Sequence, residues 1–276
     1  MLENLLWIAV ALMLVSAVSP KKTRTGKLIG GAGWGLFSVH WFYQPVYYAG
    51  INDYFNVVLT ILLAIFCIFV AYMMIVREYI HDENVNSKVS VDVTHMATAA
   101  TAIGSLMYFP FAQMQSMDVW LISIVTDHTI RALQILGYPA VLTSWDIINL
   151  NEYSVRIVLA CTAIESIALF TGLILSVRAP AIRLASAFLV SVPVIYILNI
   201  ARNVFVTVAY AEQWFGPNSF DIAHHFVAKA GSVIALLIIA YMVLKILPEL
   251  IELIDGLREM GTEQLQIIFN RISGKQ

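Results

Sequence analysis

The sequence is poor in charge, cysteine, proline and glycine, and each shortage excludes a class of protein. Only 12% of the 276 residues are charged and 60% are hydrophobic, which excludes an ordinary soluble globular domain. Two cysteines, eight prolines and fourteen glycines are too few for a disulfide-rich secreted scaffold, a collagen or a disordered chain. The net charge of −2 gives no general attraction to nucleic acid. A polytopic membrane protein remains.

Long apolar segments are what the sequence has in abundance. A membrane-spanning helix needs about 20 mostly apolar residues. Segments of this kind predict an all-α, polytopic membrane bundle of about seven helices. They cover residues 4–19, 28–49, 54–76, 95–115, 155–177, 183–211 and 223–247.

The distribution of basic residues predicts the orientation of this bundle. The densest basic cluster follows the first apolar segment and consists of Lys21, Lys22, Arg24 and Lys27. Because basic loops stay in the cytoplasm, we expect this loop inside and the N-terminus outside. Alternation then places residues 50–53, 116–154 and 212–222 outside and the tail after Lys245 inside. The chain is therefore expected in the cell membrane as a multi-pass protein.

Two further segments are apolar without the pattern of a membrane span. Within 116–154, residues 119–136 have helical spacing and predict an amphipathic outer-surface helix, which Gly137 ends. The following stretch predicts a short hairpin with Val141–Leu142 opposite Ile147–Ile148. The tail, 248–276, predicts an amphipathic cytoplasmic helix with a break at Gly261. We therefore expect a transmembrane catalytic domain over 1–247 and a separate tail over 248–276.

Reactive and ionisable side chains inside apolar segments are costly, so each suggests a functional site. Cys161 and Glu165 lie four residues apart in the fifth segment and are expected to share one helix face. The sixth segment carries Asn199, Arg202 and Asn203, and the seventh begins with the pair His224 and His225. The predicted orientation brings Cys161, Arg202 and a histidine toward the same, outer face.

These residue types fit acyl transfer. An ionised thiol is a strong nucleophile, a histidine passes protons, and an arginine stabilises a thiolate or an oxyanion. We therefore expect the Cys161 sulfur, the Arg202 guanidinium and one histidine ring to converge within about 4–6 Å, the range over which charges act on one another. Glu165 at this depth is expected either to be protonated or to pair with Arg202.

Other functions stay open from the residues alone. Cys161 by itself is typical of a packing residue. An ion-coupled transporter with Glu165, Arg202 and Lys229 as a charge relay is one alternative, and a non-catalytic lipid- or protein-binding scaffold is another. No HxxxH or CxxC spacing favours a metal, and no cofactor is expected. The other histidines, His128 among them, have no partner spacing and are interpreted as interface or loop residues.

The motifs resemble those of the archaeosortase/exosortase family. Residues 160–166, Ala-Cys-Thr-Ala-Ile-Glu-Ser, are similar to the cysteine motif of this family. Residues 201–203, Ala-Arg-Asn, resemble its arginine motif, and the histidine pair resembles its third conserved position. Thr-Ala-Ile in place of Ser-Gly after the cysteine is typical of the archaeosortase branch.

The resemblance implies a membrane-embedded thiol transpeptidase. Such enzymes resemble sortases: they cut a C-terminal signal of secreted, S-layer-type proteins and pass the acyl group to an amine, with a membrane phospholipid as acceptor. The signal consists of a Pro-Gly-Phe-type motif, a hydrophobic helix and a basic tail. By position, Cys161 is the nucleophile and Arg202 the transition-state stabiliser. His224 is the favoured third member, with His225 second and Lys229 as the alternative because some relatives use arginine there.

Overall fold

The structure is a computed structural model that describes residues 2–20, 23–50, 53–80 and 87–272. Two of the predicted basic residues, Lys21 and Lys22, lie outside the described residues. The chain forms two compact units, each built from more than one segment. Unit 1 comprises Met1–Ser105, Leu175–Arg178 and Pro248–Gln276, and unit 2 comprises Leu106–Ile174 and Ala179–Leu247.

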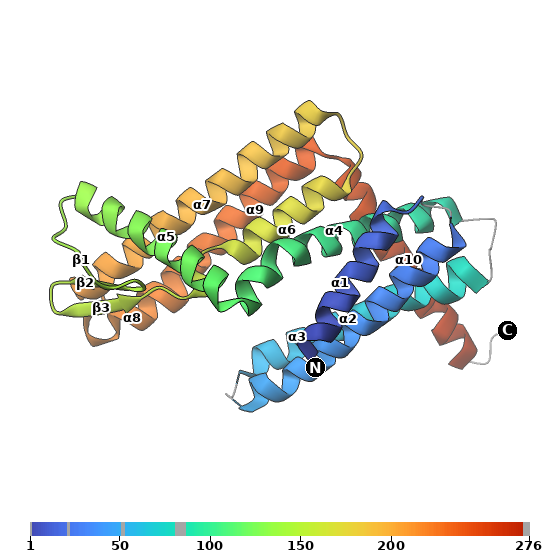
Figure 1. Ribbon diagram of the computed structural model, residues 1–276, viewed down its shortest axis with the longest axis horizontal. Coiled ribbons are helices and arrows are strands. Elements are labelled where there is room, and N and C mark those ends of the chain that lie inside the picture. Colours follow the sequence, from blue (N-terminus) through green and yellow to red (C-terminus); the bar gives the residue numbers. More distant parts are fainter. Residues whose placement is uncertain (1, 21–22, 51–52, 81–86, 273–276) are drawn as a thin grey trace. The chain divides into compact units, whose positions relative to one another are not determined.

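Unit 1 is a helical layer in which helix α2 packs against both α1 and α3 (Figure 1). Within it, the indole of Trp34 is buried and donates a hydrogen bond of 2.9 Å to the hydroxyl of Thr98 on α4. Its elements are α1 (Leu2–Val18), α2 (Arg24–Gly50), α3 (Tyr54–Tyr72), the π-helix η1 (Met73–Ile80), the first part of α4 (Ser87–Gln113), and α10 (Glu249–Ile272).

Unit 2 holds every residue predicted for the site. Helices α7 and α9 run side by side, and the small sheet packs against α5 and α7 (Figure 1). Its helices are α5 (Gln115–Ile135), α6 (Ile164–Ser176), α7 (Ala181–Ala211), α8 (Ser219–Asp221) and α9 (Lys229–Ile246). Unit 2 also contains the short 3-10 segments η2 (Leu159–Cys161) and η3 (Gly216–Asn218) and the π-helix η4 (Ile222–Ala228). Its three strands are β1 (Val141–Ser144), β2 (Ile147–Leu150) and β3 (Tyr153–Arg156).

Most of the apolar sequence becomes helical, which confirms the all-α fold apart from one small sheet. Among the described residues, three helices are long and apolar enough to cross a bilayer: Asn56–Val76, Ala181–Ala211 and Gly216–Ile246. Two further apolar helices, Asn4–Val18 and Ile164–Ser176, are shorter. The described residues therefore support three clear spans, and the expected count of about seven stays a prediction.

The predicted outer-surface segment has the expected order of elements. Helix α5 occupies residues 115–135, and Gly137 follows it with a φ of +89°, a conformation that suits glycine. Val141 and Leu142 then pair with Asn149 and Ile148, so the hairpin is confirmed. A third antiparallel strand, β3, was not predicted and pairs with β2. Its sequence, Tyr-Ser-Val-Arg, falls where the fifth span was expected to begin.

Two predictions about helix limits are wrong. The segment 155–177 is not one helix: it starts as strand β3, turns through η2, and becomes helical only at Ile164. The tail helix has no break at Gly261, because α10 continues from Glu249 to Ile272. A single glycine costs a helix only about 1 kcal/mol, which the apolar side chains of α10 that pack into unit 1 offset.

Candidate active site

Cys161 lies on a tight turn that joins strand β3 to helix α6. Its backbone N–H donates to the carbonyl of Val158 at 2.7 Å, and the next N–H, of Thr162, donates to Leu159 at 3.0 Å. Ala163 follows with a φ of +61°, and α6 begins at Ile164. The helix is interrupted between Cys161 and Glu165, so the predicted shared helix face is wrong.

The local sequence explains why the chain turns here. The Thr162 hydroxyl donates to the Leu159 carbonyl at 2.7 Å and accepts from the N–H of Ile164 at 3.4 Å, so it holds the turn and caps α6. A left-handed φ at a residue other than glycine costs about 1–3 kcal/mol and persists only where the surroundings enforce it. The turn at Cys161 is therefore a built feature of the fold.

Two asparagines of α7 hold this turn from the other side. The Nδ2 groups of Asn199 and Asn203 donate to the carbonyl oxygen of Cys161 at 2.7 and 3.0 Å. Both asparagines are buried, and their spacing of four residues puts them on one face of α7. A carbonyl oxygen has two lone pairs, and both are used here. The backbone of Cys161 is thus fixed to the helix that carries Arg202.

The thiol itself is covered. Cys161 is 8% exposed and belongs to an apolar cluster with Ile157, Val204 and Val208. The other cysteine, Cys67 of α3, is 2% exposed, as expected for a packing residue. Burial alone therefore does not separate the two cysteines; the difference is the turn and its two asparagines.

A cavity of about 450 Å³ lies beside the turn. Leu159, Ala160 and Ala163, which flank Cys161, form part of its wall together with α7 and α9. Its lining is mostly apolar, and its charged members are Glu165, Arg202 and Lys229. Cys161, His224 and His225 are not among the lining residues. The predicted convergence of thiol, guanidinium and imidazole stays a prediction.

Glu165 and Arg202 share the cavity without pairing. Within the described ranges, the polar partner of the Glu165 carboxylate is the hydroxyl of Tyr108 on α4, which donates to Oε1 at 3.4 Å. No carboxylate lies within salt-bridge distance of Arg202 in that part of the chain. Glu165 is exposed to the open cavity, so the burial that was expected to force the pair is absent.

The two adjacent histidines have different surroundings. His224 is half-buried and stacks on Phe220 with ring centres 5.3 Å apart and an interplanar angle of 10°. His225 is exposed, with Nε2 4.0 Å from a carboxylate oxygen of Asp221. The two histidines therefore differ in burial and in their neighbours, and which of them serves the predicted site stays a prediction.

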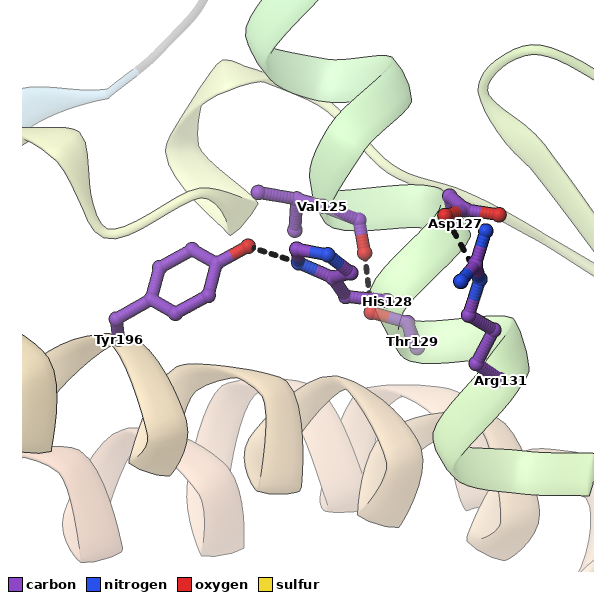
Figure 2. Close-up of polar contacts among 6 residues, drawn as sticks. All are labelled: Val125, Asp127, His128, Thr129, Arg131 and Tyr196. Carbon is purple, nitrogen blue, oxygen red and sulfur yellow. Dashed lines mark hydrogen bonds and ion pairs between the residues drawn. The ribbon is translucent and has the colours of Figure 1, made fainter. Parts of the chain in front are cut away.

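A second histidine contact was missed by sequence reasoning. His128 of α5 lies with Nδ1 2.6 Å from the hydroxyl of Tyr196 on α7 (Figure 2). His128 was interpreted from the sequence as an interface or loop residue, and this contact was not predicted. On the same helix, Arg131 pairs with Asp127 at 2.9 Å (Figure 2). Tyr196 also packs against the apolar cluster that contains Cys161.

The sequence contains little signal for these tertiary contacts. His128 and Tyr196 are 68 residues apart, and Asn199 and Cys161 are 38 apart. The spacing of Asn199 and Asn203 in an apolar helix was the available signal for the second contact, which the sequence analysis did not predict. Such a pair in a membrane helix indicates a buried acceptor on a neighbouring segment.

Comparison with known proteins gives one consistent result. The family model described as "Transmembrane exosortase (Exosortase_EpsH)" matches residues 3–244. Archaeosortase A of Haloferax volcanii is 25% identical, with 94% of each chain covered. Archaeosortase A of Natronomonas pharaonis is 26% identical over 92% of this chain and 87% of the relative. No solved structure matches the chain.

Proposed function

Because the chain belongs to the transmembrane exosortase family, we propose that it is a membrane-embedded, sortase-like cysteine transpeptidase. Its substrates are secreted proteins with a C-terminal sorting signal of a Pro-Gly-Phe-type motif, a hydrophobic helix and a basic tail. The enzyme cleaves near the motif and transfers the protein to the amine of a membrane phospholipid. The names of the two curated relatives and the cysteine and arginine motifs support this assignment.

The fixed turn at Cys161 is the observation that carries the proposal. A cysteine that only fills space needs no special backbone, whereas this one has a 3-10 turn, a left-handed residue and two buried amide donors around it. Nucleophiles are commonly presented at such strained turns next to a helix N-terminus. The cavity with Arg202 lies directly beside the turn.

The reaction assigns one role to each residue. The Cys161 thiolate attacks the scissile carbonyl, and Arg202 stabilises the oxyanion that forms. The C–N bond then breaks, and His224 gives its proton to the leaving amine, which leaves a thioester on Cys161. The acceptor amine attacks the thioester, its proton passes to His224, and Cys161 leaves as the thiolate, which restores the thiolate and the protonated His224 with which the cycle began. His225 is the alternative proton carrier, and Glu165, Asn203 and Lys229 support the site.

The covered thiol implies a movement before the first step. Cys161 must turn from its apolar cluster toward the cavity wall formed by Ala160 and Ala163. The small side chains of these two alanines leave room for this rotation. We expect substrate binding in the adjacent cavity to drive this rotation.

The surroundings of the reaction follow from the same proposal. The membrane catalytic domain covers residues 1–247, with its site on the extracytoplasmic side, and residues 248–276 form a cytoplasmic tail. The cavity's apolar walls fit a hydrophobic signal, and its cations, Arg202 and Lys229, fit a phospholipid head group. The net charge gives no reason to invoke nucleic acid.

One observation favours a different function. Glu165, Arg202 and Lys229, the three residues of a hypothetical charge relay, do line the same cavity. An ion-coupled transporter would use them and would have no need of a thiol. The two functions therefore differ in how they depend on Cys161.

The test compares the two cysteines of the chain. The purified protein is incubated in nanodiscs with a synthetic peptide of a Pro-Gly-Phe motif, an apolar helix and a basic tail, plus hydroxylamine as a soluble amine. Mass spectrometry should find a hydroxamate on the N-terminal fragment with the wild type and with Cys67→Ser, and none with Cys161→Ser. Cleavage that survives in Cys161→Ser would refute the cysteine mechanism.

A further inference from the structure

Strand β3 is an edge strand with one side unpaired. The sheet has the order β1-β2-β3, so β3 pairs with β2 and, among the described residues, with no other strand. Ser154 and Arg156 of β3 are exposed. Unpaired edges are templates for another strand, and proteins usually cover or blunt them.

The register shows which backbone groups point outward from this edge. The N–H of Ile157 donates to the carbonyl of Asp146 at 2.8 Å, so these two residues form a hydrogen-bonded pair of the ladder. In an antiparallel ladder, hydrogen-bonded pairs alternate with pairs whose main-chain groups point away. Val155 opposite Ile148 is therefore bonded to β2. The N–H and C=O groups of Ser154 and Arg156 point away from β2.

These outward groups have no other main-chain partner within the part of the chain that the structure describes. The Arg156 side chain does not cover these backbone groups, because its Nε lies 3.2 Å from a carboxylate oxygen of Asp146, beside β2. In a membrane protein such unpaired backbone groups are costly unless they meet water or a partner. The edge thus offers two donors and two acceptors in the repeat of a β-strand.

This edge leads directly to Cys161. After Arg156 the chain stays extended as far as Val158, whose φ and ψ are −118° and 170°. The turn that follows brings the N–H of Cys161 to 2.7 Å from the Val158 carbonyl. At about 3.3 Å per extended residue, Arg156 and the turn are separated by only two to three residues of a strand.

We propose that β3 is the substrate-docking edge of the enzyme: an extended segment of the protein substrate, next to its scissile bond, adds to the sheet along Ser154 and Arg156. This inference rests on the proposed function, because it needs a peptide substrate for Cys161. A polypeptide is the ligand whose own N–H and C=O groups repeat with the two-residue period of the edge. The strand would hold the peptide main chain while the adjacent cavity takes a side chain.

Proline scanning tests this edge and has a matched control in the same sheet. Ser154→Pro removes one outward N–H and leaves the bonds to β2 intact, since proline is tolerated at edges where the N–H faces outward. Leu142→Pro is the control: Leu142 lies opposite Ile148, whose main chain faces β3, so its N–H points out from the far edge, β1. With the signal peptide as substrate in nanodiscs, Ser154→Pro should raise KM by roughly five- to tenfold, the effect of one hydrogen bond, at unchanged kcat. Leu142→Pro should leave both constants unchanged.

A cross-linking experiment makes the result independent of turnover and of the folding of the proline variants. A photoreactive benzoylphenylalanine replaces Ser154 or Leu142 in the full chain with Cys161→Ala, so the bound peptide stays intact. Irradiation should attach the peptide at position 154 and not at position 142. One outcome would overturn the docking edge alone. In it the wild type cleaves the peptide, Ser154→Pro has an unchanged KM, and no adduct forms at position 154. An adduct at 154 without any cleavage by the wild type would support the edge and overturn the proposed chemistry.

Discussion

The Nδ2 group of Asn199 donates a hydrogen bond of 2.7 Å to the backbone carbonyl of Cys161. Asn203, one turn further along α7, donates to the same oxygen at 3.0 Å. The contact fixes the backbone of the proposed nucleophile rather than its thiol. It also ties Cys161 to Arg202, because the two asparagines and the arginine lie on the same helix.

Removal of this bond should impair both stability and turnover. Asn199→Asp keeps the shape but replaces a donor by an acceptor, which repels the Cys161 carbonyl. Loss of a buried hydrogen bond costs about 1–3 kcal/mol in the free energy of unfolding. We expect a loss of this size and a lower kcat with little change in KM, measured by denaturant unfolding and peptide cleavage. Asn218→Ala, at an exposed position of η3, is the control and should change neither.

Arg202 should matter for the chemical step and not for folding. It is half-buried in the cavity wall and pairs with no carboxylate of the described chain, so its replacement leaves no orphaned partner. Arg202→Ala should lower kcat by about 100- to 1,000-fold, as for the loss of an oxyanion donor. Arg202→Lys should recover part of this, because lysine keeps the charge but not the planar fork.

Arg183 supplies the matched control for Arg202. It lies at the other end of α7 and donates to the carbonyl of Ile246 at 3.3 Å, which is a structural role. Arg183→Ala should therefore lower stability with little effect on the cleavage rate of the folded fraction. Equal rates for Arg202→Ala and the wild type would remove Arg202 from the mechanism.

Substitutions of the two histidines should differ in their effect on kcat in the same cleavage assay. His224 is half-buried and stacks on Phe220, whereas His225 is exposed. His224→Asn should lower kcat by roughly 100- to 10,000-fold, the contribution of a general acid–base group. His225→Asn should stay within a few-fold of the wild type. The reverse order would assign the proton transfer to His225.

The contact between His128 and Tyr196 should contribute to stability alone. The hydrogen bond of 2.6 Å and the T-shaped packing of the two rings connect α5 to α7. Tyr196→Phe removes the hydroxyl and keeps the ring, so we expect a loss of about 1 kcal/mol in the free energy of unfolding. A double-mutant cycle with His128→Phe should give a coupling energy of about 0.5–1.5 kcal/mol. Zero coupling would show that the contact contributes nothing.

Hydropathy predicted the positions of the long helices well where a segment is uniformly apolar. Residues 183–211 lie in α7, and residues 223–247 contain most of η4 and all of α9, because apolar side chains recur in every turn of these segments. It failed at residues 155–163, where an equally apolar run forms a strand and a turn. Contacts from outside the segment hold this strand and turn: Asp146, in the turn before β2, pairs with Arg156, and Asn199 and Asn203 of α7 bind the Cys161 carbonyl.

In the candidate site, too, some features could be predicted from the sequence and others depend on tertiary structure. Residue types and their order along the chain were sufficient to select Cys161, Arg202 and the histidine pair. The predicted ion pair of Glu165 with Arg202 failed because it assumed a continuous helix and a closed interior. Ala163, with its left-handed backbone, redirects the chain between Cys161 and Glu165. A single φ angle at an ordinary alanine leaves no mark in a hydropathy pattern.

The shortness of α6 has a consequence for where the acyl group is handed over. Thirteen residues give a helix of about 20 Å, whereas the hydrocarbon layer is about 30 Å thick. A helix that starts at one surface therefore stops about 10 Å below the other, and the turn with Cys161 continues from that level. The proposed thioester would then form within one leaflet, about 10 Å below the surface of the hydrocarbon layer, so an acceptor lipid of that leaflet could reach it by lateral diffusion. The asparagine amides would then take the place of water for a backbone that has left the helix inside the bilayer.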